Sequence, residues 1–233
     1  MKRLMVFSWI LMMCLLPLSA FGEDWGLAED LTGTWTISSE GEPGCLIQYV
    51  LPQFVAADPA DEAISRFFAN LAETGPTEEL LVMAEGADAL RLSYQLTHMD
   101  DRYLGLVLLA DDGFGGGGML PIVFARDGIY AGERIGLSQL LGLESDEGNM
   151  QLNRMVTGLI WEIVQKDQQN LDRSYLEGLS LETVEASLNP EWDFLLDDGG
   201  NLVFLIAPGE IAAEVDGWLE FPFSPEELIN GMK

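Results

Sequence analysis

Positive charge and histidine are both scarce in this sequence. Eleven lysines and arginines face 39 aspartates and glutamates, which gives a formal net charge of −28. Such a chain repels phosphate, so nucleic acid is excluded as a natural partner. The charge favours basic proteins, cationic peptides or metal ions, whose encounter it would accelerate. Solubility, or adaptation to a salty or acidic milieu, explains the same composition equally well.

The scarcity of histidine and cysteine excludes several kinds of catalytic site. Catalytic Ser-His-Asp and Cys-His arrangements need a histidine, and the only one is His98, which ends an alternating strand pattern and is expected to be structural. Pairing of His98 with Cys45 is the alternative. Zinc sites need clustered histidine and cysteine, and no acid stands in a catalytic motif. We therefore expect neither catalysis nor a cofactor.

The first 22 residues have the layout of a secretory signal peptide. A basic Met-Lys-Arg start is followed by an apolar run, and Ala20 and Gly22 are the small residues that precede the expected cleavage site. The alternative is an uncleaved membrane anchor. Cleavage removes Lys2 and Arg3 and takes the net charge from −28 to −30. We expect an extracytoplasmic protein, periplasmic or secreted, with no later segment that spans a membrane.

Only one cysteine, Cys45, remains after that cleavage, so no intramolecular disulfide is expected. A lone thiol is usually a small buried hydrophobic residue, and an intermolecular disulfide is the alternative. Residues 23–44 form an acidic lead-in that contains one strand candidate, Thr-Gly-Thr-Trp-Thr-Ile-Ser.

Hydrophobic periodicity predicts α+β architecture with two closely packed subdomains. Residues 45–125 hold strand patterns around a helix that begins after Asp58, and residues 126–233 hold helices followed by strands. Antiparallel sheets with helices packed on one face are expected. The elements expected in the second subdomain are a helical turn at Leu137–Leu141, helices at Met150–Gln168 and Leu181–Leu188, and strands at Leu202–Ile206 and Trp218–Phe223.

The stretch Asp-Asp-Gly-Gly-Asn at 197–201 predicts a tight hairpin turn. A loose oxygen-ligand site for calcium, made by Asp197, Asp198 and Asn201, is the alternative. An EF-hand loop starting at Asp197 fails, because Leu202 stands where glycine is required and Pro208 where glutamate is required.

A loop of small and acidic residues joins the last two predicted strands and contains no nucleophile or histidine. We expect it to be presented to a partner. Its candidate binding residues are Pro208, Glu210, Ile211, Ala212, Glu214, Asp216 and Gly217.

The last third of the chain resembles the RsiV/PdaC-type extracytoplasmic domain, formally a domain of unknown function. That domain occurs in lysozyme-sensing anti-sigma factors and beside peptidoglycan deacetylase domains. The family loop has Tyr, Pro and Tyr where Gly209, Ala213 and Glu214 stand here, so two aromatic surfaces are missing. The matching residues are Phe194, Asp198, Gly199, Val203, Phe204, Pro208, Glu210, Ile211, Ala212 and Gly217.

The resemblance implies the fold and an extracytoplasmic setting. With the acidic loop, it leads us to expect a secreted, non-catalytic binding module of the cell envelope. The partner would be a basic extracellular protein, such as a lysozyme, or a cell-wall component. The alternatives are an accessory or structural envelope protein and, after that, a peptidoglycan-active enzyme that uses carboxylates.

Overall fold

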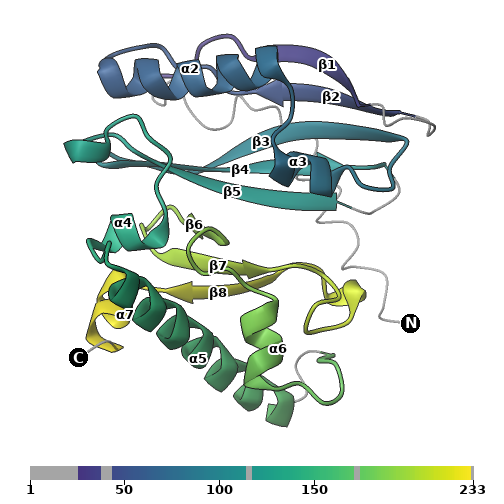
Figure 1. Cartoon of the computed structure of the whole chain (residues 1–233), viewed down its shortest axis with the longest axis vertical. Helices are drawn as coiled ribbons and strands as arrows, with labels where there is room; N and C mark the ends of the chain where they lie inside the picture. Colours follow the sequence, from purple (N-terminus) through teal and green to yellow (C-terminus); the bar gives the residue numbers. More distant parts are fainter. Residues whose placement is uncertain (1–25, 38–43, 114–116, 171–173, 232–233) are drawn as a thin grey trace, which may run out of the picture.

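The computed structural model describes residues 26–37, 44–113, 117–170 and 174–231. They form two sheets with helices packed against each (Figure 1), which confirms the α+β class expected from the sequence. The predicted signal peptide, with Ala20 and Gly22, lies outside the described residues. In the described part of the chain, every helix is too short or too polar to cross a membrane.

The first sheet is built from alternating apolar and polar residues. In its central strand Leu90, Leu92 and Tyr94 are buried while the residues between them are exposed, as the sequence predicts. The strand expected in the acidic lead-in is present and forms one edge of this sheet. The strand order is β1 (Leu31–Ile37), β2 (Cys45–Leu51), β3 (Ala89–Met99), β4 (Tyr103–Asp111) and β5 (Gly117–Ala125).

One strand pair differs from the expected antiparallel arrangement. The strands β2 and β3 run parallel, with Leu46 opposite Ala89, so the first sheet is mixed. A parallel pair needs a long crossover, and here the crossover carries α2 (Pro59–Thr74) and α3 (Glu78–Met83). Strand patterns alone do not reveal the direction of pairing.

Helix α2 begins where the sequence predicts it and covers the first sheet. The carboxylate of Asp58 accepts the backbone N–H groups of Ala60 and Asp61, each at 2.9 Å, and so caps the helix. Its buried face includes Phe68, which packs edge-on against Phe124 of β5 with ring centroids 5.8 Å apart. The helix therefore contributes its apolar stripe to the core of this half.

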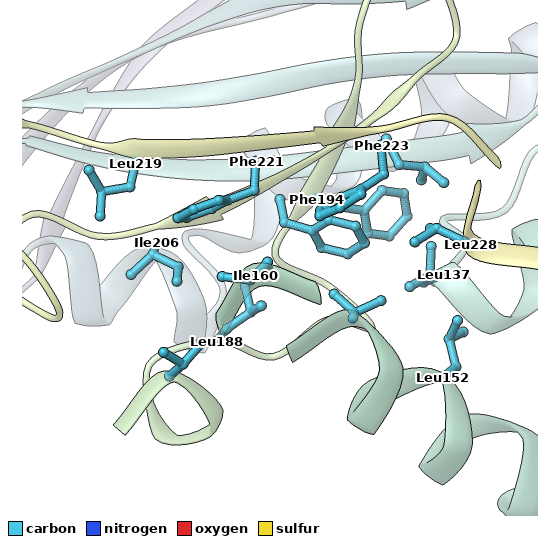
Figure 2. Close-up of a cluster of buried hydrophobic side chains, with 14 of the residues drawn as sticks. Leu137, Leu152, Ile160, Leu188, Phe194, Ile206, Leu219, Phe221, Phe223 and Leu228 are labelled. Atoms are coloured by element: carbon cyan, nitrogen blue, oxygen red, sulfur yellow. The ribbon is translucent and has the colours of Figure 1, made fainter. Parts of the chain in front are cut away.

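The second sheet packs against the helices of the C-terminal half. Figure 2 shows Phe194, Ile206 and Phe221 from three strands facing Ile160 of the long helix. The long helix and the last two strands match their predictions, and β6 is the first strand of the hairpin that the turn at 197–201 implies, whereas α7 was not expected. The elements are α4 (Leu137–Leu141), α5 (Asp146–Asn170), α6 (Leu181–Ala186), β6 (Phe194–Leu196), β7 (Leu202–Ile206), β8 (Leu219–Phe223) and α7 (Pro225–Gly231).

The two sheets meet where β6 crosses β4. A Cβ atom added to Gly105 would lie 3.4 Å from Cβ of Leu196 and 2.9 Å from Oγ1 of Thr97. Beside this crossing, Nδ1 of His98 lies 2.9 Å from the backbone oxygen of Asp197, and Nε2 lies 3.3 Å from Oδ2 of Asp100. A carbonyl only accepts, so Nδ1 carries the proton. His98 is thus structural, as expected, and joins β3 to the β6–β7 turn.

Gly105→Ala tests this crossing. The added methyl group must displace Thr97 or Leu196, so we expect the free energy of unfolding to fall by about 1–3 kcal/mol. The matched control is Gly158→Ala in the middle of α5, where an added Cβ meets no atom within 4 Å. That change should raise the free energy of unfolding by roughly 0.5–1 kcal/mol. Urea denaturation measures both, and equal effects would contradict the close approach of the sheets.

Candidate functional site

The loop between β7 and β8 is fixed to the core by its middle. Ile211 and Ala212 are 0% and 2% exposed and belong to the hydrophobic core of the C-terminal half. Burying these two apolar side chains leaves the residues on either side of them at the surface. The loop lies beyond the right-hand ends of β7 and β8 in Figure 1.

A second segment, far away in the sequence, pairs with this loop. The N–H of Leu176 donates to the oxygen of Ile211 at 3.0 Å, and the N–H of Ala213 donates to the oxygen of Ser174 at 2.9 Å. The N–H of Ser174 in turn donates to Oδ2 of Asp216 at 3.0 Å. Because these bonds satisfy backbone groups of both segments, they hold the segments together as one surface.

Five exposed side chains project from these paired segments, and we call them the acidic tip. Val215 is 84% exposed and Leu176 is 41% exposed. Each of these apolar side chains has an acid as its neighbour in the sequence, Glu177 after Leu176 and Glu214 before Val215. The acidic tip consists of Leu176, Glu177, Glu210, Glu214 and Val215.

Glycine sets the shape of the loop at two positions. Gly209 has a φ of 85° and lies beneath Glu214, whose Cγ would be 3.3 Å from an added Cβ. Gly217 has a φ of 68° and donates its N–H to the oxygen of Glu214 at 3.0 Å. Both φ values lie in the region that side chains other than glycine rarely adopt. Glycine at 209 and 217 thus has a local conformational reason.

The stretch of chain that carries the acidic tip is rich in acids. Residues 174–231 contain thirteen acids and no lysine or arginine. Among the described residues, no ion pair involves Glu177, Glu210 or Glu214. Their fields therefore add outside the molecule and fall off over about 10 Å at 0.1 M salt.

The structure divides the candidate loop residues into two groups. Glu210 and Glu214 are exposed, whereas Ile211 and Ala212 are buried and hold the loop in place. Pro208 is half-buried, Asp216 accepts the N–H of Ser174, and Gly217 ends the short η3 turn (Glu214–Asp216). Leu176 and Glu177 were not predicted, because the pairing that places them involves residues about 35 positions apart and leaves no local pattern.

The stretch 197–201 forms the β6–β7 hairpin turn. Oδ1 of Asp197 accepts the N–H groups of Gly199 at 2.8 Å and Asn201 at 2.9 Å, and Oδ2 accepts the amide of Asn201 at 2.9 Å. Partial burial acts to raise the pKa of Asp197, but the hydrogen bonds from Asn201 and Gly199 outweigh it and lower the pKa. A calcium site at Asp197, Asp198 and Asn201 stays a prediction.

The thiol of Cys45 and the grouping of possible metal ligands are the remaining features of the described residues. Cys45 is 9% exposed in the core of the first half, where burial and then Asp88 raise the pKa of its thiol. A raised pKa reduces the fraction of reactive thiolate. Within the described ranges, no three His, Cys, Asp or Glu residues gather as a metal ion would require.

Comparison with known proteins gives a structural likeness only. No protein-family model and no curated protein matches the chain. The solved structures that are similar include two of DUF3298 family proteins. The one from Pseudomonas aeruginosa PAO1 has 16% identity and a TM-score of 0.47, covering 87% of this chain and 92% of its own. The one from Bacteroides fragilis NCTC 9343 has 11% identity and a TM-score of 0.44, covering 89% and 98%.

The Asp197 turn generates a pH-dependent prediction. Asp197→Ala removes the acceptor of three N–H bonds, so we expect a loss of about 1–2 kcal/mol in the free energy of unfolding at pH 7. The folded pKa of Asp197 is lowered, so its stabilisation is present above the unfolded value of about 3.9 and is lost as the pH falls through the folded value. The difference between variant and parent should therefore shrink in acid.

Thermal unfolding between pH 7 and pH 3 measures this difference. Asp198→Ala is the matched control, because Asp198 is the exposed neighbour in the same turn and its removal should change stability by less than about 0.5 kcal/mol. Equal losses in the two variants, or a gap that widens in acid, would contradict the role of the Asp197 carboxylate.

Proposed function

We propose that this protein is an extracytoplasmic, non-catalytic binding module that captures a basic protein of the cell envelope through the acidic tip. The observation that carries the proposal is the pairing of residues 174–176 with residues 211–213. It brings three carboxylates without ion-pair partners among the described residues next to two exposed apolar side chains.

The chemistry of the acidic tip suits a cationic protein surface. Exposed charges contribute mainly to the rate and selectivity of encounter, and apolar contacts contribute to retention. Leu176 and Val215 would pack against apolar surface of the partner, while Glu177, Glu210 and Glu214 would meet its lysines and arginines. A surface this small favours a transient complex.

The absence of catalysis is part of the proposal. The only histidine in the sequence, His98, is 8% exposed and has both ring nitrogens directed to Asp197 and Asp100. It is therefore unsuited to act as a general base on a substrate. There are two alternatives: an accessory envelope protein without a soluble partner, and an enzyme that acts on peptidoglycan through carboxylates. Lack of binding to a lysozyme would favour them.

A lysozyme is the specific partner that we propose, on the resemblance of residues 190–230 to the RsiV/PdaC-type domain. The signal-peptide layout of residues 1–22 supports the extracytoplasmic setting. The tyrosines that the family carries are missing at Gly209 and Glu214. Binding here would therefore depend more on charge than on aromatic contact, and its salt dependence would be correspondingly steep.

Reversal of two tip charges tests the proposal. We expect Glu210→Lys with Glu214→Lys to weaken binding to a lysozyme at least tenfold, because the partner's cations then meet like charge. Isothermal titration calorimetry at about 0.05 M and 0.15 M salt measures the affinity. The control is Glu73→Lys with Glu85→Lys, which makes the same charge change at exposed positions of the first half.

The control separates a defined surface from general attraction between opposite charges. The proposal predicts that the control variant retains at least half of the parent's affinity at the higher salt. Equal weakening in both variants, or heat that disappears entirely at the higher salt, would mean that no particular surface is recognised. Unchanged affinity in the tip variant would assign binding elsewhere.

A further inference from the structure

A groove of about 510 Å³ lies between α5 and α6, two helices that run side by side in Figure 1. Its volume is within the range of roughly 300–1,000 Å³ that is usual for small-molecule sites. Its apolar wall is formed by Met150, Leu188 and Pro190. The other lining residues are polar or charged: Asn153, Arg154, Thr157, Glu185 and Asn189. None of the lining residues belongs to the acidic tip.

One wall of the groove presents a hydrogen-bond acceptor that lacks a donor. Oδ1 of Asn153 is buried and has no hydrogen-bond partner among the described residues. Thr157, one turn further along α5, donates its hydroxyl hydrogen to the backbone oxygen of Asn153 at 2.9 Å, so its lone pairs also remain free to accept. A buried carbonyl oxygen without a donor is unfavourable, and a ligand N–H would satisfy it once the Asn153 side chain turned this oxygen toward the groove.

The two walls also carry opposite charges that do not pair with each other. Arg154 lines the groove from α5 and Glu185 lines it from α6, and within the described part of the chain neither forms an ion pair. In contrast, Arg66, Arg126 and Arg134 each contact a carboxylate. An unpaired guanidinium in a chain of net charge −28 is available for a carboxylate, which it can bind through two parallel hydrogen bonds.

We infer that the α5–α6 groove binds a short zwitterionic peptide. Arg154 takes the peptide carboxylate and Glu185 takes its ammonium group. Oδ1 of Asn153 accepts a peptide N–H, and Met150 and Leu188 contact its small side chains. A free peptide and the exposed end of a longer chain share this chemistry, and the experiment distinguishes them by blocking each end in turn. The site does not depend on the acidic tip.

The probe is the dipeptide alanyl-alanine, titrated to about 10 mM into the full mature chain labelled with ¹⁵N, since ligands of this size bind weakly. We expect saturable amide shifts confined to α5, α6 and the residues up to 190. If Arg154 holds the carboxylate, the amidated dipeptide should bind with about tenfold lower affinity. If Glu185 holds the ammonium, the N-acetylated dipeptide should show a similar loss of affinity.

Single variants assign the contacts. Arg154→Gln and Glu185→Gln should each weaken binding about tenfold, whereas Lys166→Gln, an exposed change of the same charge on α5 outside the groove, should have no effect. Arg154 and Glu185 are exposed, so the variants should fold, and their amide spectra verify this. The inference is overturned if the dipeptide produces no saturable shifts. It is also overturned if both groove variants show the same shifts as the parent.

This outcome is independent of the proposed function. Glu210→Lys with Glu214→Lys should leave dipeptide binding unchanged, and Arg154→Gln should leave lysozyme binding unchanged. If both blocked dipeptides bind as well as the free one, the groove does not recognise peptide ends, and the assignment to a zwitterion is wrong. If only the N-acetylated form binds as well as the free form, the ligand is a carboxyl-terminal chain end, and the contact with Glu185 is wrong.

Discussion

The crossing of β6 over β4 is the contact on which the rest of the molecule depends. Gly105 lets Leu196 approach the first sheet, and His98 bonds to the turn that follows β6. This contact fixes the β6–β7 hairpin, and β7, buried along its whole length, carries the chain to the loop that bears the acidic tip. The surface that we propose for binding is thus positioned by apolar packing and by hydrogen bonds, including those that the carboxylates of Asp197 and Asp216 accept.

Charge in this protein is used in two different ways. Some acids are part of the fold: Asp61 is 5% exposed and pairs with Arg126, and Asp197 accepts three N–H groups of its turn. The guanidinium or N–H groups beside such carboxylates offset their negative charge, so these acids contribute little to the electric field outside the molecule. The acids of the tip form no ion pair among the described residues. The scarcity of positive charge in the sequence is consistent with this.

Local patterns in the sequence predicted the elements of the fold but not their pairing. The cap at Asp58, the alternation from Leu90 to Tyr94 and the apolar stripe of α5 each depend on neighbouring residues, so they could be read directly. The parallel β2–β3 pair could not, because strand direction is set by the crossover. Of the acidic tip, Glu210 and Glu214 were candidates from the sequence and are exposed, whereas Leu176 was not a candidate, since only tertiary hydrogen bonds place it beside Ile211.

Hydrogen exchange of the protein, alone and in the presence of excess lysozyme at near-physiological salt, tests the central claim most directly. If the acidic tip is the binding surface, amides of residues 174–177 and 209–217 should exchange more slowly in the mixture, while those of α2 and β3 should not change. Protection confined to the first sheet, or no protection at any lysozyme concentration, would contradict the account.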